Sequence, residues 1–192
     1  MTLRLIAAPG TEPITRAQAA LYVKQDGSDD NDILDLLITT ARGEAEHLLG
    51  RALIQQTWER VLDCFPWAEI ELGMPPIASI TSVKYTDTAG AEQTFDANGY
   101  VLDSARIPGW VLPADGYSWP ATADTVNAVR VRFVCGYGTN ATDVPAPIRT
   151  WISMRVATLY DYRQDVAAGV SVAQLPSRHM DRLLDPYTVH AV

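Results

Sequence analysis

Two cysteines and three histidines are the side chains of this sequence that could support nucleophilic or metal chemistry. Cys64 and Cys135 form no CxxC pair, and His47, His179 and His190 are scattered along the chain. A zinc site needs such ligands at short spacing, and a reactive thiolate needs a cation or a helix N-terminus beside it. Both cysteines stand at the edges of probable strands, so we expect two buried, inert thiols without a disulfide framework or a metal.

Two further segments resemble binding loops only in part. The run 26–32 contains four aspartates, but a calcium loop counted from Asp26 needs glycine and glutamate where Asn31 and Leu37 stand. Segment 135–138 contains two glycines, but it lacks the remainder of a dinucleotide or P-loop motif. The acidic run is typical of a helix start, and the glycines are typical of a turn that leaves a strand.

The overall charge restricts the partners. The formal net charge is −8, and 23 carboxylates stand against 15 Lys and Arg residues. This balance opposes wrapping of DNA, although an acidic passage would let DNA slide without sticking. We find neither a signal peptide nor an apolar run long enough to span a membrane, and we expect a cytosolic chain. We predict a non-enzymatic protein without a cofactor.

Helical patterns flank the middle of the chain. Thr15 caps an expected helix from Arg16 to about Lys24, which Asp26 and Gly27 end. A second helix, capped by Ser28 or Asp29 and closed by Gly50 and Arg51, has one broad apolar stripe. Its members are Ile33, Leu34, Leu37, Ile38, Ala41, Ala45, Leu48 and Leu49. The first 13 residues show no periodicity and are interpreted as an arm.

Between these helices and the C-terminal ones, short β-branched and aromatic stretches alternate with turns. The expected strands are 57–64, 69–72, 79–86, 93–95, 100–102, 109–112 and 128–134. We therefore predict an α+β fold. Its helical bundle has two N-terminal helices and one long and one short C-terminal helix, and a small antiparallel β-sheet or barrel is inserted into it. Residues 1–54 and 141–192 form the predicted helical domain, and 55–140 form the insertion.

The long C-terminal helix begins near Pro145 and Pro147 and is apolar on more than one side, which indicates burial from more than one direction. A composition typical of a linker follows, and Leu175-Pro176-Ser177 then opens a short helix that Pro186 stops. We interpret 175–192 as a possible partner-docking tail, and a tail folded back on its own domain is the equal alternative. The expected contact residues are Ile148, Trp151, Ile152, Leu159, Tyr160, Met180, Leu183, Leu184 and Tyr187.

The order of elements and several short segments resemble a known family. The segments are Ile14–Ala19, Ala41–Glu46, Gly50–Leu53, Pro75–Ile80, Val134–Gly138, Pro145–Ile148 and Leu183–Tyr187. In order and spacing they resemble the head–tail connector (adaptor) proteins of tailed bacteriophages, prophages and gene transfer agents, in the branch with a β-rich insertion. The resemblance covers nearly the whole chain, from about Ile14 to Tyr187.

The resemblance implies a structural subunit of the virion neck, made in the bacterial host cytoplasm. Such proteins form a ring, typically of twelve copies, below the portal protein. The ring extends the DNA channel without sequence-specific DNA binding, and it gives the downstream neck or tail protein a docking platform. The family brings no catalytic residue, cofactor or metal, and no membrane contact.

A ring repeats one heterologous contact, so each copy needs two different adhesive faces. The helix at 148–162 could provide one face, and the helix at 30–49 could provide the other. Three alternatives stay open. One is another neck or tail-completion protein, such as a stopper. The others are a small cytosolic enzyme that uses a cysteine or a carboxylate pair, and a binding domain with a ligand pocket in the β insertion.

Overall fold

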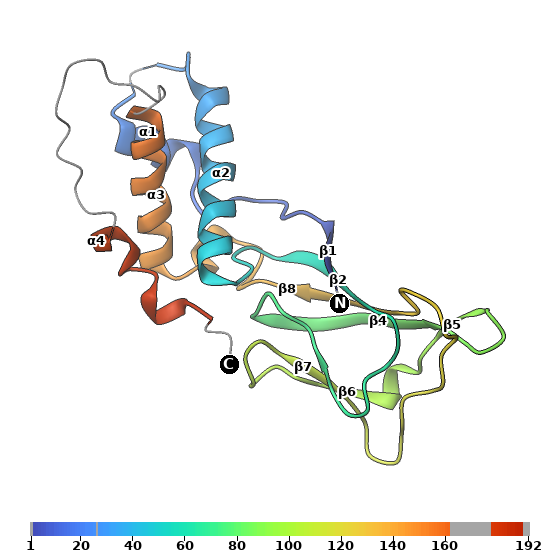
Figure 1. Ribbon diagram of the computed structural model, residues 1–192. Helices are drawn as coiled ribbons and strands as arrows, with labels where there is room; N and C mark the ends of the chain where they lie inside the picture. The colour runs from blue at the N-terminus through green and yellow to red at the C-terminus, as the bar shows by residue number, and fades with distance from the viewer. Residues whose placement is uncertain (1, 26, 162–177, 190–192) are drawn as a thin grey trace. The chain divides into compact units, whose positions relative to one another are not determined.

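The computed structural model describes residues 2–25, 27–161 and 178–189, and the chain divides into two compact units (Figure 1). Residues 1–10 and 55–137 form the β unit, and residues 11–54 and 138–192 form the helical unit. The sequence prediction assigns residues 1–54 to the helical domain. The first ten residues belong to the β unit instead, because their strand pairs with a strand of that unit.

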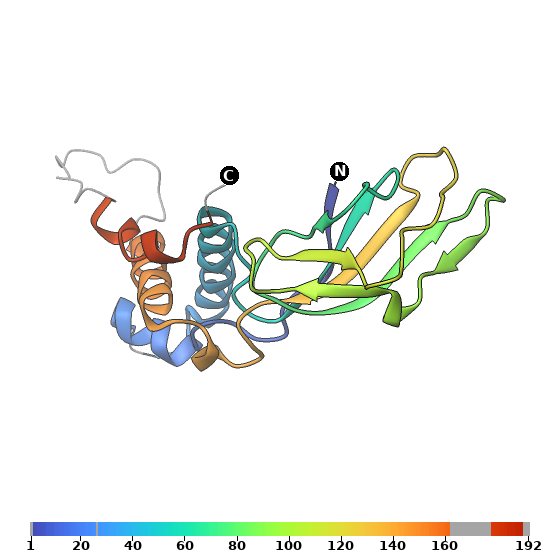
Figure 2. The same cartoon turned by 90° about the horizontal axis from the view of Figure 1, so that it is seen from below.

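The larger sheet of the β unit has five antiparallel strands, seen from a second side in Figure 2. In spatial order they are β1 (Thr2–Ala7), β2 (Gln56–Leu62), β8 (Val129–Cys135), β4 (Ile77–Thr86) and β5 (Glu92–Thr94). The interpretation of the first residues as an unstructured arm is therefore wrong. As an edge strand, β1 has no buried side chain, and the short alternation of Leu3, Arg4 and Leu5 breaks at Ile6, so the strand gives only a weak signal in the sequence.

A second sheet of three antiparallel strands completes the unit. Its order is β3 (Ile70–Glu71), β7 (Trp110–Pro113) and β6 (Tyr100–Asp103). The α+β class is confirmed, but two sheets stand where the sequence indicated one sheet or barrel. Aromatic side chains link the sheets: the Phe65 ring contacts Tyr85 of β4, and the Phe95 ring contacts Tyr100 of β6.

The core of the β unit follows the pleat of β8. Val129, Val131 and Phe133 are fully buried, while Arg130 and Arg132 point to the opposite face, as their alternation in the sequence predicts. Gly109, just before β7, has a φ of +99°, and a Cβ added there would lie 2.5 Å from Cγ1 of Ile77. Only glycine tolerates both the backbone conformation and this close approach.

The helical unit contains α1 (Arg16–Val23), α2 (Asn31–Leu49), α3 (Ala146–Asp161) and the short α4 (Arg178–Asp181). Thr15 caps α1, as predicted, and the cap is a capping box with Gln18. The helix ends near Lys24, as expected, but Lys24 itself closes it in the left-handed conformation, where Asp26 and Gly27 were expected to do so. The cap residue of α2 is Asp30 rather than Ser28 or Asp29, and Gly50 closes the helix.

One face of α2 and one face of α3 form the core of the helical unit. The fully buried side chains are Leu34, Ile38, Ala41, Ala45 and Leu49 from α2 with Ile148, Trp151, Ile152 and Val156 from α3. The buried carboxylate of Glu46 accepts hydrogen bonds from Arg42 at 2.8 Å and from the backbone N–H of Leu53 at 2.9 Å. Because both partners are largely buried, this carboxylate fixes the chain where it leaves α2.

The C-terminal segment is less helical than predicted. Its first expected residues, 175–177, lie outside the described residues, and α4 has only four residues. The 3₁₀ turn η3 (Asp185–Tyr187) follows and contains Pro186, which was expected to end the helix. Across the residues described here, no helix is long and apolar enough to cross a membrane.

Candidate functional site

The contact residues expected on α3 divide into two groups. Ile148, Trp151 and Ile152 are at most 2% exposed and belong to the core of the helical unit, so in this structure they offer no surface to a partner. Leu159 and Tyr160 are half-buried, and the Tyr160 hydroxyl hydrogen-bonds Asp30 at the start of α2. The several apolar sides of α3 are therefore explained mainly by helices of its own unit.

The described part of the expected docking tail is folded onto the helical unit. The Val189 N–H donates to the Leu49 carbonyl at 2.9 Å, and Arg51 donates to the Tyr187 carbonyl. The indole N–H of Trp151 donates to Asp181 at 3.2 Å. Residues 178–189 thus have the alternative arrangement, folded back on their own domain.

Of the expected contact residues in this tail, Leu184 is 3% exposed and buried against the unit. The three that keep part of their surface are Met180, Leu183 and Tyr187. Any contact that residues 178–189 make with a partner therefore uses a half-exposed surface held on the helical unit rather than a free helix.

The thiols lie apart from each other. Gln56 pairs with Cys135 at one end of β2, whereas Cys64 follows Leu62 at the other end, roughly 20 Å away by the strand rise. A disulfide between them is excluded at that separation. Cys135 is buried as expected, but the expectation of a buried Cys64 is wrong, because this thiol lies exposed in the loop after β2.

Metal ligands do not gather in the part of the chain that is described. No group of three or more His, Cys, Asp or Glu side chains there could hold a metal ion. His47 is exposed on α2, and His190 falls outside the described residues.

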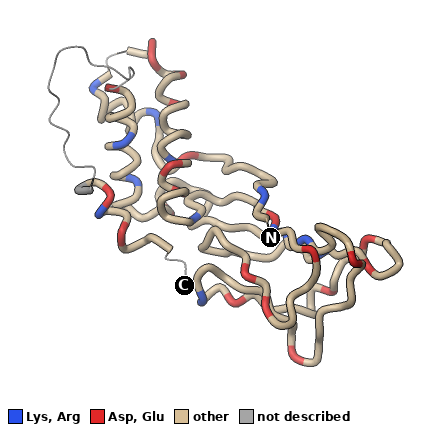
Figure 3. The backbone as a smooth tube through the Cα atoms, in the orientation of Figure 1, with Lys and Arg blue, Asp and Glu red and all other residues tan. Residues whose placement is uncertain are grey.

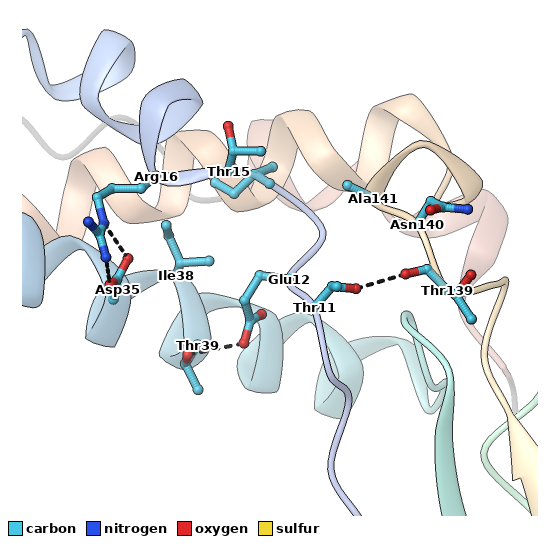
Figure 4. A pocket seen from close by; sticks show the side chains of 11 residues that line it. Thr11, Glu12, Thr15, Arg16, Asp35, Ile38, Thr39, Thr139, Asn140 and Ala141 are labelled. Carbon is cyan, nitrogen blue, oxygen red and sulfur yellow. Dashed lines mark hydrogen bonds and ion pairs between the residues drawn. The ribbon is translucent and has the colours of Figure 1, made fainter.

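The pocket in Figure 4 lies in the helical unit and measures about 450 Å³. Its walls come from residues 11–16, from α2, and from residues 139–141. Residues 11–16 and 139–141 lie where the chain enters the unit for the first and for the second time. The Thr11 hydroxyl donates to the Thr139 carbonyl at 2.8 Å and so ties these two segments together. Ile14 and Ile38 contribute an apolar wall.

Both carboxylates of this pocket are already engaged. Asp35 forms an ion pair with Arg16, and the hydrogen bond from that guanidinium lowers the pKa of Asp35. Glu12 accepts hydrogen bonds from Thr39 at 3.1 Å and from Arg42 at 2.8 Å. A general acid or base near neutral pH needs a pKa raised toward the working pH, and Asp35 shows the opposite shift.

The sequence indicated the helix at 30–49 as an adhesive face, but it did not identify which residues of α2 form the exposed apolar face. The broad stripe seen in the sequence is divided by the structure: five members face the core, whereas Ile33 and Leu48 are 38% and 46% exposed. Leu36, which was not part of the stripe, is 66% exposed. At 3.6 residues per turn these three side chains share the solvent side with Thr40 and Gly43. The sequence contains a weak signal for this face, because Ile33 and Leu36 are three residues apart and so lie on one side of a helix. The longer stripe of core residues obscured it.

Trp67 is the second feature that the sequence did not single out. Trp119 stacks on Phe65 at 4.8 Å, and Trp110 lies under the guanidinium of Arg106 at 4.5 Å. Trp67 is fully exposed, beside the Ala68 carbonyl that accepts the Trp119 indole N–H. An exposed tryptophan on an ordered loop is typical of a protein contact.

The fold is found in assembled particles. A chain from the neck of an empty gene transfer agent (GTA) particle, computed with C6 symmetry, matches with a TM-score of 0.81 and 21% identity. A chain from the virion of a native GTA particle matches with a TM-score of 0.78, and one from the native GTA neck, computed with C12 symmetry, with 0.72. Each match covers 100% of this chain and 98% of the other. No family model and no curated protein matches.

Proposed function

We propose that this chain is a structural subunit of the neck of a tailed phage, prophage or gene transfer agent. It acts there as a head–tail adaptor in a ring below the portal, typically of twelve copies. The ring extends the DNA channel and carries the next neck or tail protein. The observation that carries the proposal is the fold match to GTA neck and virion chains, which includes both units over the full length.

The surface chemistry of the helical unit supports this role. A heterologous ring contact needs an adhesive face that is left exposed when the subunit is alone. The α2 face defined by Ile33, Leu36 and Leu48 spans 15 residue steps, or about 22 Å at 1.5 Å per residue. We assign this face to the contact between neighbouring copies.

A second surface is assigned to the portal. Leu159, Tyr160, Met180, Leu183 and Tyr187 are half-buried residues of α3 and the C-terminal segment, and they keep part of their apolar surface in solvent. They replace the predicted free tail as the portal-docking candidate, because the described tail residues are held on the helical unit.

The direct experiment mixes the purified chain with the portal protein encoded beside it and measures binding by co-sedimentation. An adaptor binds the portal without any further component, and several copies bind per portal. A stopper would bind only after an adaptor ring is present, and that result would move the chain one position along the neck. No binding to the portal or to an adaptor-loaded portal would contradict the proposal.

A further inference from the structure

One face of the five-stranded sheet is basic in an otherwise acidic protein. In the register of the sheet, Glu59 of β2 pairs with Arg4 of β1 on one side and with Arg132 of β8 on the other. Two residues away along β8, Arg130 pairs with Lys84 of β4. Side chains at these positions point to the same side of the pleat. The β unit has six Lys and Arg residues against ten Asp and Glu residues, and four of the six cations lie on this face.

Two carboxylates on the same face hold the cations in place. The Glu59 side chain is only 5% exposed. It accepts hydrogen bonds from Arg132 at 2.9 and 3.2 Å, and it lies 3.6 Å from the Arg4 guanidinium. Glu92 of β5 bridges Lys84, at 2.9 Å, and Arg130. Four cations against two carboxylates leave an excess of two positive charges on this face. The ion pairs also hold the cationic side chains in place, so a partner that binds them loses less side-chain entropy.

The face also contains a hollow of about 260 Å³ at the β1 side. Thr2, Arg4, Glu59, Val61, Asn127 and Arg130 line it. The Arg4 side chain is 66% exposed and that of Arg130 39%, so both guanidiniums remain accessible from solvent. A carboxylate that enters between them would receive charge-assisted hydrogen bonds from two sides.

The charge distribution favours another copy of this chain over DNA as the partner. A DNA backbone laid across the face would meet the two carboxylates together with the cations, and the −8 charge of the whole chain would repel it at long range. Acidic surface is available on every copy. At the start of α2, Asp29 and Asp32 are exposed beside the exposed Ile33 (Figure 3, where the upper end of α2 carries acidic residues).

We propose that the basic sheet face of one copy binds the acidic start of α2 on the next copy around the ring. This inference rests on the proposed function and names the partner surface of the α2 face assigned above. Electrostatic complementarity then fixes the register of the contact, while the apolar α2 residues bury the surface beside it.

Carbodiimide coupling tests the contact, because it joins lysine to carboxylate only where the two touch. Rings are assembled on the portal from equal amounts of unlabelled and ¹⁵N-labelled chain, and mass spectrometry identifies links that join the two isotopes. The expected link is Lys84 of one copy with Asp29 or Asp32 of another. Lys84→Arg keeps the charge and should abolish the link while leaving the ring intact.

Charge exchange gives the second measurement. Arg4→Glu with Arg130→Glu should weaken ring assembly at least about tenfold, and Asp29→Arg with Asp32→Arg should do the same. Combining the four changes should restore assembly. Arg106→Glu, which makes one such Arg→Glu change at a cation outside this face, is the control and should assemble as the wild type does. Circular dichroism establishes that each variant is folded.

The outcomes separate this inference from the proposed function. Rings that form without isotope-mixed links, and that tolerate Arg4→Glu with Arg130→Glu, would overturn the inference and leave the function standing. Protection of Lys84 from acetylation only when DNA fills the ring would overturn it in favour of DNA. If wild-type chain forms no ring on the portal, both fail together.

Discussion

Replacing Trp151 tests whether α3 serves the core of its own unit or an interface, because a core residue affects the stability of the fold and an interface residue affects assembly. The side chain is 2% exposed between helices of its own unit, and its indole N–H donates to Asp181. Truncating a buried tryptophan to alanine usually costs about 3–5 kcal/mol, because a large cavity remains. Trp151→Phe keeps most of the apolar volume and loses the hydrogen bond, so we expect a cost of about 1–2 kcal/mol. Domain stabilities are typically about 5–15 kcal/mol, so the alanine variant should lose a large share.

The assay is urea unfolding followed by circular dichroism at 222 nm, which reports the helical unit. Tryptophan fluorescence is less suitable, because four of the five tryptophans belong to the β unit. Leu36→Ala is the matched control: its side chain is 66% exposed, and its effect on stability should stay within about 0.5 kcal/mol while ring assembly weakens. If Trp151→Ala kept wild-type stability and lost only assembly, the assignment of α3 to the core would be refuted.

Three further predictions concern the β unit. A thiol reagent should modify only Cys64 in the folded protein and also Cys135 after denaturation; fast reaction of both thiols in the native state would be inconsistent with the burial of Cys135. Gly109→Ala should lower the unfolding midpoint clearly, by about 1–3 kcal/mol in stability, because a Cβ would meet Ile77; an unchanged midpoint would show that the loop adapts. The hydrogen bond from Lys84 and the charge of Arg130 lower the pKa of Glu92 below its unfolded value near 4.5. The Glu92 carboxylate therefore stabilises the fold fully above pH 4.5, and this contribution is lost as the pH falls through the lowered pKa. Thermal melts of wild type and Glu92→Gln should therefore differ at pH 6 and converge near pH 3, and a constant difference would contradict this linkage.

Local patterns predicted those elements whose side chains alternate strongly between core and solvent. The alternation along β8 and the long stripe of α2 gave both elements and their core faces, because burial on one side imposes a period on the sequence. The edge strand β1 has no buried side chain, so its backbone pairing with β2 left only a weak pattern in its residue types. Strand pairing of this kind is a property of the tertiary fold.

The contact residues were harder to predict for a related physical reason. An apolar residue has the same identity whether it packs against its own domain or against a partner. Trp151, predicted as a contact residue, therefore turned out to lie in the core, whereas Leu36, for which the sequence suggested no role, is exposed. The basic sheet face was hidden as well. Arg4 and Arg132 are 128 positions apart in the sequence, and only the register of β1, β2 and β8 brings them to either side of Glu59.

Cryo-electron microscopy of particles made with and without this gene product tests the central claim most directly. The account predicts a rotationally symmetric ring of this chain in the neck, with α2 faces between neighbouring copies, and heads that lack tails when the chain is absent. Complete tailed particles in its absence, or intact necks in which no density fits the two units, would contradict it.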